Sequence, residues 1–321
     1  MLRLFPLLGV LAAVCLLSIA IGVRPIPPGD VVAALFGRGG PDVAGIVWGA
    51  RIPRTALGLL VGVGLGLAGT LMQALTRNPL ADPGLLGISA GAAFGVVIAV
   101  AAIGVTSLYG YIWFAFAGAL VTSAVVYALG RSSPVTLALT GVAAGALLTS
   151  ITSGIALVDP DSLNRYRFWA AGSLAGPDPS LVWQVAPFVL AGSVLALATG
   201  PALNSLALGE DAAVALGRRV GWVRLQGFSA VTLLTGAAVA AAGPIVFVGL
   251  VVPHAARLLI GPDHRRLLPV AAVLAPILLL GADILGRVVV RPGEVGVGIV
   301  VALLGAPFFI ALVRRRRLAE L

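Results

Sequence analysis

Residues Thr55–Leu75 read TALGLLVGVGLGLAGTLMQAL and contain no charged side chain. A helix needs about 20 mostly apolar residues to cross the hydrocarbon core of a bilayer, and this segment is long enough. Gly58, Gly62 and Gly66 recur at every fourth position, which gathers small residues on one helix face. The segment therefore predicts a membrane-spanning helix against which a second helix packs closely.

The composition of the whole chain agrees with this reading. Of its 321 residues, 60% are hydrophobic and only 10% are charged, and the mean hydropathy is +1.09. A soluble globular protein is about 45–50% apolar and about 25% charged. The composition therefore excludes an ordinary soluble enzyme, a disordered chain and a nucleic-acid-binding module.

Nine further apolar runs accompany this segment, so we expect an all-α polytopic membrane protein with ten transmembrane helices. The expected spans are Leu4–Val23, Thr55–Leu75, Leu85–Gly104, Ile112–Gly130, Val135–Val158, Leu181–Leu203, Val223–Ala242, Ile245–Ile260, Leu267–Val290 and Val295–Val313. They fill one transmembrane domain over residues 1–321. The eighth span is short and follows Gly243-Pro244, so we expect it to be broken or partly re-entrant.

The charge pattern sets the orientation. All 21 basic residues are arginines, and with both termini in the cytoplasm thirteen of them lie on the cytoplasmic side against eight outside. The run Arg314–Arg317 favours this orientation most clearly. A P-loop needs a lysine that this chain lacks, so it does not hydrolyse ATP by that route. His254, His264 and Cys15 form no metal-ligand pattern, and we expect no metal site and no cofactor.

A polar connection on the cytoplasmic side, residues 204–222, reads as one or two short helices. Glu210 and Asp211 suit the positive end of a helix, and Gly217 is a plausible C-terminal stop. A short helix with apolar Ala212, Ala213 and Leu216 can lie in a groove of a partner protein.

Several segments together resemble the FecCD family of ABC importer permeases. The resemblance is carried by Arg51-Ile52-Pro53-Arg54, by Arg77-Asn78-Pro79-Leu80-Ala81-Asp82-Pro83-Gly84, by Gly243–Leu250, by Asp263-His264-Arg265-Arg266 and by Gly305-Ala306-Pro307-Phe308. These segments follow the family's order and span nearly the whole chain.

The resemblance implies a transport subunit and not an enzyme. Such a subunit pairs with a second permease, identical or homologous, and two cytoplasmic ATPases dock below it. An extracytoplasmic substrate-binding protein docks above. The implied location is the bacterial cytoplasmic (inner) membrane, and the implied cargo is a ferric siderophore carried by alternating access.

The resemblance also assigns roles to residues. The docking residues for the binding protein are Arg51, Arg54 and Arg287, although Asp283 could hold Arg287 in an ion pair four residues away. The residues that contact the ATPase are Glu210, Asp211, Ala213, Leu216, Gly217 and Arg218. The gate candidates are Asn78, Leu80, Pro134 and Val135, which could equally be structural turn residues.

Three alternatives stay open at this stage. The cargo could be haem or cobalamin, carried by the same kind of machine. The chain could be an ion-coupled secondary transporter, but its spans offer no chain of Asp, Glu or His across the membrane. A membrane-embedded enzyme needs a titratable cluster in the bilayer, and Asp283 stands almost alone there.

Overall fold

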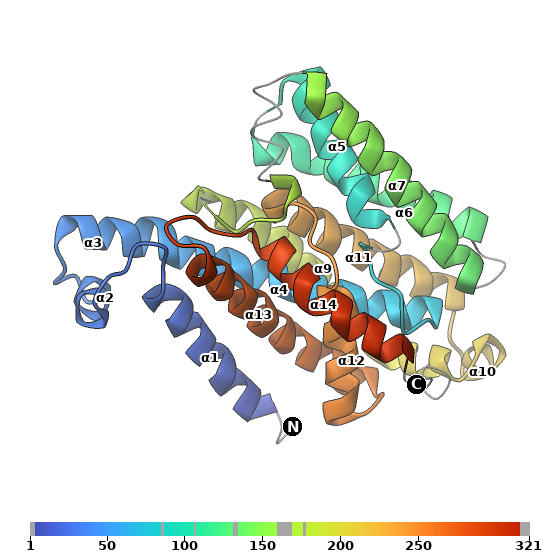
Figure 1. Cartoon of the computed structure of the whole chain (residues 1–321). Helices are drawn as coiled ribbons and strands as arrows, with labels where there is room; N and C mark the ends of the chain where they lie inside the picture. Colours follow the sequence, from blue (N-terminus) through green and yellow to red (C-terminus); the bar gives the residue numbers. More distant parts are fainter. Residues whose placement is uncertain are drawn as a thin grey trace.

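The computed structural model describes residues 4–84, 87–105, 107–130, 134–158, 169–175 and 178–314. The ten predicted spans appear as ten long helices in this part of the chain, with ends that differ by a few residues (Figure 1). They are α1 (Leu4–Ala20), α4 (Ile52–Thr76), α5 (Ile88–Ile103), α6 (Leu108–Gly130), α7 (Pro134–Val158), α9 (Pro179–Ala207), α11 (Val220–Ala242), α12 (Val248–Ile260), α13 (His264–Val289) and α14 (Val297–Arg314). The all-α polytopic fold is confirmed. Of the terminal arginine run, Arg315–Arg317 lie outside the described residues.

The segment between α1 and α4 contains helices that the sequence reading missed. These are α2 (Pro28–Leu35), α3 (Pro41–Ile46) and the π-helical turn η1 (Val47–Arg51), which leads directly into α4. Pro28 and Pro41 occupy the first helical position, where a missing N–H costs nothing. The helix widens into η1 just before Pro53, which has no N–H to donate to the preceding turn.

Helix α4 runs through the centre of the bundle, and its glycines allow neighbours to approach closely. A Cβ added at Gly62 would lie 2.6 Å from the Cα of Pro276, and one at Gly66 would lie 2.5 Å from the Cβ of Ala275. Both neighbours belong to α13, so the predicted small-residue face packs against that helix. The two core clusters meet on α4, through Leu67 and Leu71 on one side and Leu57 and Val61 on the other.

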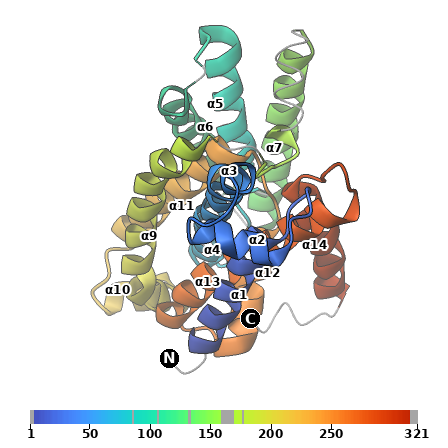
Figure 2. The same cartoon turned by 90° about the vertical axis from the view of Figure 1, so that its left-hand side faces the viewer.

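Helices α9 and α11 pack directly on α4, and the other long helices form two groups around this centre. Helices α5, α6 and α7 pack on one another at one side of α4, as Figure 2 shows. Helices α12, α13 and α14 lie at the other side, and α1 packs against α13. Large apolar residues such as Trp113, Leu147 and Leu303 are exposed on the flanks, which suits contact with lipid or another subunit.

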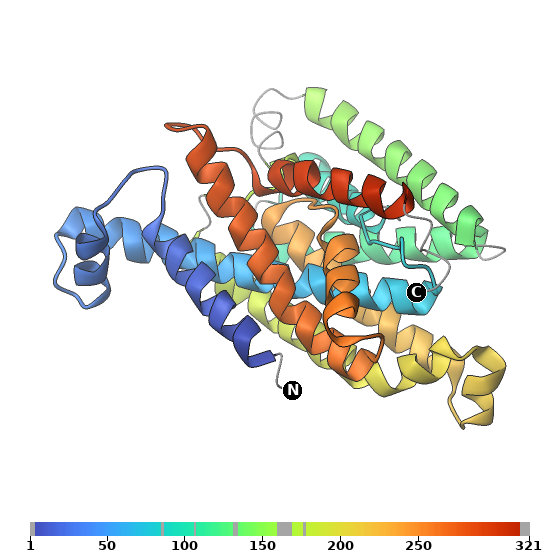
Figure 3. The ribbon, with the colours of Figure 1, turned by 60° about the horizontal axis from the view of Figure 1, so that its bottom comes forward.

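The two ends of the bundle differ in structure. Helices α2 and α3 lie at one end, and the short helix α10 (Glu210–Ala215) lies at the opposite end (Figure 3). The arginine distribution predicts that the α10 end is cytoplasmic, so we name it the cytoplasmic end and call the α2–α3 end the outer end. The eighth predicted span is shorter than expected: residues 243–247 are not helical, and α12 runs without a break from Val248 to Ile260.

Candidate functional site

The outer end of α1 is closed by arginines from two other helices. The last carbonyl groups of any helix lack partners within that helix. Arg51 donates to the carbonyl oxygens of Ile19 at 2.8 Å, Ala20 at 2.7 Å and Arg24 at 2.8 Å. A guanidinium group at this position also compensates the negative end of the helix dipole. Arg51 is therefore a cap for α1.

Arg287 completes this cap from α13. It donates to the carbonyl oxygens of Ser18 at 2.9 Å and Ile21 at 2.8 Å, and to the Ser18 hydroxyl at 2.8 Å. Arg291 reaches the carbonyl oxygen of Gly22 at 2.9 Å. The outer end of α1 is thus fixed to η1 by Arg51, to α13 by Arg287 and to the segment after α13 by Arg291.

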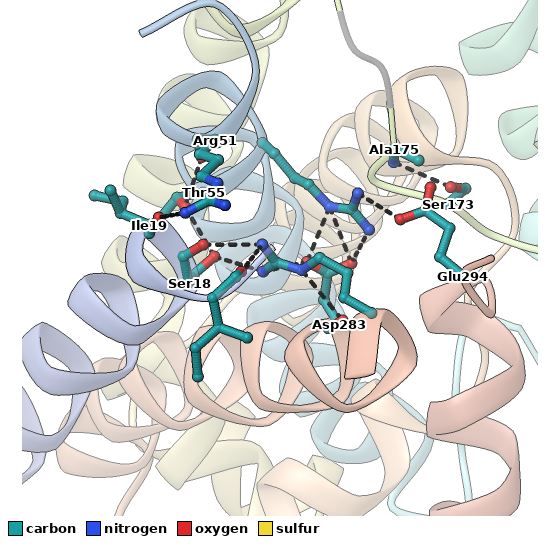
Figure 4. A network of polar contacts seen from close by, with 11 residues as sticks. Ser18, Ile19, Arg51, Thr55, Ser173, Ala175, Asp283 and Glu294 are labelled. Carbon is teal, nitrogen blue, oxygen red and sulfur yellow. Dashed lines mark hydrogen bonds and ion pairs between the residues drawn. The ribbon is translucent and has the colours of Figure 1, made fainter. Parts of the chain in front are cut away.

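One buried carboxylate holds two arginines together, as Figure 4 shows. Asp283 has no solvent exposure and lies 2.7 Å from Arg54 Nη2 and 2.8 Å from Arg287 Nη2. Arg54 uses its other side, Nη1, to bind Glu294 at 2.8 Å. Because Glu294 belongs to the connection between α13 and α14, this network joins α4, α13 and that connection.

This geometry changes the interpretation of the predicted docking residues. Arg51 is 4% exposed and Arg287 is 2% exposed, so neither forms the exposed cationic rim that we expected. The ion pair between Asp283 and Arg287 does form, but it is buried. Arg51 and Arg287 act within the chain in this conformation, and docking stays a prediction for all three arginines.

A cavity of about 360 Å³ opens beside this network at the outer end. Its lining contains four arginines (Arg24, Arg51, Arg54 and Arg287) and one carboxylate, that of Glu294. The excess of positive charge suits an acidic group that approaches from outside.

The predicted short helix at the cytoplasmic end is present as α10. Glu210 and Asp211 occupy its first turn. Gly217 has φ of +77° and follows the helix, with hydrogen bonds from Gly217 N to Val214 O at 2.8 Å and from Arg218 N to Ala213 O at 2.9 Å. This pair of bonds is a Schellman motif, which explains why a glycine ends the helix there.

Not every residue predicted on this surface is accessible. Asp211, Leu216, Gly217 and Arg218 are exposed. Ala213 is only 1% exposed and faces the chain's own helices in this conformation, and its contact with an ATPase stays a prediction.

The structure adds two features to this surface that the sequence reading missed. Val214 is 61% exposed beside Leu216, which gives α10 an apolar outer face. Glu210 binds Arg224 of α11 and lies 3.8 Å from Arg77, so it ties α10 to α11 and to the end of α4.

The predicted gate loop between α4 and α5 folds back into the bundle. Asn78 Oδ1 accepts a hydrogen bond from Leu80 N at 2.9 Å, which confirms a local turn. Asp82 is 2% exposed, and a Cβ added at Gly249 would lie 2.6 Å from Asp82 Oδ2. This buried carboxylate was also missed. Pro134 and Val135 begin α7, but their side chains lie outside the described residues.

Gln73 joins α4 to the start of α12. Pro253 has no N–H for the carbonyl oxygen of Gly249 one turn earlier, and Gln73 Nε2 supplies a donor at 3.3 Å instead. The side-chain oxygen of Gln73, Oε1, in turn accepts a hydrogen bond from Arg257 Nη2 at 2.6 Å. The cytoplasmic halves of α4 and α12 are therefore fixed to each other by one amide side chain.

Comparison with known proteins agrees with this arrangement. A family model described as the FecCD transport family matches residues 10–315. The chain belongs to the FecCD transport family. It is 50% identical over 305 residues to the ferric enterobactin transport system permease protein FepD of Escherichia coli, covering 94% of this chain and 91% of that protein.

Two further similarities support the assignment to the FecCD family. The cobalamin import system permease protein BtuC of Halobacterium salinarum is 40% identical over 294 residues, covering 90% of this chain and 79% of that protein. A solved structure described as an inward-facing ABC transporter of the metal-chelate type superposes with a TM-score of 0.83 at 30% identity, covering 98% of this chain and 99% of that one. This FecCD chain therefore has the fold of an ABC transporter permease.

Proposed function

We propose that this FecCD chain, residues 1–321, is the permease subunit of an ABC importer for ferric siderophores in a bacterial cytoplasmic membrane. The observation that supports the cargo is the 50% identity to a ferric enterobactin permease along nearly the full length of both chains. The cobalamin relative is 40% identical, so cobalamin is the second candidate.

The proposed mechanism is alternating access powered by separate ATPase subunits. The chain pairs with a second permease, identical or homologous, and substrate passes between the two. An ATPase binds the exposed face of α10, where Leu216 and Val214 supply apolar contact and Asp211 and Arg218 supply charge. Glu210 transmits the movement of α10 to α11 through Arg224 and to the end of α4 through Arg77. The loop of Asn78 and Leu80 narrows the cytoplasmic mouth.

Crosslinking tests the ATPase contact. In a background in which Cys15 is replaced by serine, we expect Leu216→Cys to capture an ATPase subunit that carries a matching cysteine. Ala213→Cys is the matched control, because Ala213 lies three residues before Leu216 but is buried. Capture of the ATPase by Ala213→Cys, or no capture by Leu216→Cys, would show that the ATPase contact lies elsewhere on the chain.

A substrate-binding protein docks on the outer end in this proposal. Arg24 and Arg38 are exposed there, whereas Arg54 offers only its edge beside Glu294. Acidic side chains of the binding protein meet these arginines and enter the cavity, while Arg51 and Arg287 hold the surface in shape from beneath. Charges of this kind mainly set the association rate and the register.

Charge reversal tests this docking surface. We expect Arg24→Glu together with Arg38→Glu to slow association with the binding protein by about tenfold at low salt and to flatten its salt dependence. Arg218→Glu, which is exposed at the opposite end, is the control. Association rates measured over a salt series decide the question, and identical curves for both variants would exclude docking through Arg24 and Arg38.

The cargo is tested by uptake into proteoliposomes that contain the co-purified complex. We expect ATP-dependent accumulation of a ferric catecholate chelate that exceeds accumulation of cobalamin or haem. Preferred accumulation of cobalamin would support the second candidate, and ferric chelate would then be excluded as the main cargo.

A further inference from the structure

Asn204 connects the root of α10 to a turn between two other helices. It lies in the last turn of α9, six residues before α10 begins at Glu210. Its side-chain Nδ2 donates to Asp263 Oδ1 at 2.6 Å. Its Oδ1 accepts from the backbone N–H of His264 at 2.8 Å and lies 2.9 Å from His264 Nδ1. One amide therefore binds both the N-cap and the first residue of α13.

The bound residues form the N-terminus of α13. Asp263 is the N-cap of that helix, and its Oδ1 also accepts from Arg265 N at 3.0 Å. The hydrogen bond from Asn204, followed by that from Arg265, lowers the pKa of Asp263, so its carboxylate stays charged at the positive end of α13. The Asn204 amide donates to this carboxylate and accepts from the next N–H, a pair of roles that neither an apolar side chain nor an ionised carboxylate can fill.

The spacing of the two helices agrees with this contact. A Cβ added at Gly200 would lie 3.5 Å from the carbonyl oxygen of His264, so α9 lies against the first turn of α13 without overlap. His264 itself is 8% exposed. The hydrogen bonds of Asn204 to His264 are therefore made beside a packed contact, whereas the Asp263 side chain is 43% exposed.

The turn bound by Asn204 continues into the centre of the bundle. Helix α12 ends at Ile260, three residues before Asp263, and carries Arg257, which binds Gln73 of α4. A displacement of α10 that moves the end of α9 therefore reaches α12 and α13 through Asn204, and α4 through Arg257. The route by Glu210 reaches α11 and α4 but not this turn.

We propose that Asn204 is a positioning residue that couples movement of α10 to the α12–α13 pair during transport. The inference rests on the proposed function, because it assumes that an ATPase moves α10. Without the Asn204 side chain, the ATPase still docks and hydrolyses ATP, but α12 and α13 do not follow the movement of α10.

The experiment uses the whole complex in proteoliposomes and measures ferric chelate transported per ATP hydrolysed. In Asn204→Asp two carboxylates face each other and the hydrogen bond between positions 204 and 263 is lost. We expect the amount of chelate transported per ATP to fall at least about fivefold, which is the lower end of the usual range for coupling between two sites. The double variant Asn204→Asp with Asp263→Asn exchanges donor and acceptor, and we expect it to restore the ratio. Ser205→Ala is the control, because within the described segments the Ser205 hydroxyl bonds to Pro201 O of its own helix and to no other group.

The outcomes separate this inference from the proposed function. If the wild-type complex shows no ATP-driven transport, the proposed function fails. If the wild-type complex transports and Asn204→Asp keeps its ratio, or the double variant is no better than the single one, the role of Asn204 is excluded. Crosslinking at Leu216 reports whether the ATPase is still docked. If Asn204→Asp does not assemble, Asn204→Ser replaces it, since one hydroxyl cannot reach both partners.

Discussion

Asp283→Ala lowers the free energy of unfolding by about 3–5 kcal/mol, the usual effect of removing one partner from a buried ion pair. Asp283 is the carboxylate that Arg54 and Arg287 share, and none of the three is more than 12% exposed. Its loss leaves two cations facing each other inside the protein. The expected result is a strongly reduced midpoint of thermal unfolding in detergent, together with poor yield.

Asp42→Ala provides the matched control for this result. Asp42 is an exposed carboxylate in the first turn of α3 at the same end of the molecule. Its removal costs no more than about 1 kcal/mol, the value of a carboxylate at a helix N-terminus. Equal unfolding midpoints for the two variants would show that Asp283 does not hold the outer network together.

Gly69→Ala is the second substitution with a large expected effect. A Cβ at Gly69 would lie 2.1 Å from the carbonyl oxygen and 2.2 Å from the Cα of Gly249, both backbone atoms of α12. Backbone atoms cannot move aside as a side chain can, so α4 and α12 must separate. Overpacking typically costs about 1–3 kcal/mol, and we expect the upper end of that range here.

Replacement of Gly281 by alanine is expected to stabilise the protein, the opposite of the effect at Gly69. Apart from the backbone of its own helix, a Cβ added at Gly281 in α13 would meet no atom within 4 Å in the part of the chain that the structure describes. Alanine there stabilises the helix by roughly 0.5–1 kcal/mol. The fraction of monodisperse protein after heating separates the two variants, and a fall of equal size in both would contradict the assigned close approach of α4 and α12.

The sequence predicts the long helices well because each apolar run carries its own signal. The run Thr55–Leu75 lies within α4, and the Gly-Pro before Ile245 precedes the start of α12. It also predicts α10 and its end at Gly217, which depend on neighbouring residues. Helices α2 and α3 are short, and only Pro28 and Pro41 indicated their first positions.

The ion pair of Asp283 with Arg287 could be predicted from its four-residue spacing, but most other polar contacts could not, because their partners lie far apart along the chain. Arg287 binds Ser18 across 269 positions, and Asn204 binds Asp263 across 59. An arginine near the end of a span looks the same in the sequence whether it is buried or exposed. The sequence of a segment as short as α10 and its cap also does not show that Ala213 is buried and Leu216 is exposed.

The central claim is that this polypeptide moves substrate only when other subunits hydrolyse ATP. The most direct measurement is accumulation of a ferric chelate in proteoliposomes that contain the purified chain alone, with an imposed ion gradient, compared with vesicles that also contain the ATPases, binding protein and ATP. We predict accumulation only in the second set. Accumulation by the chain alone would contradict the claim.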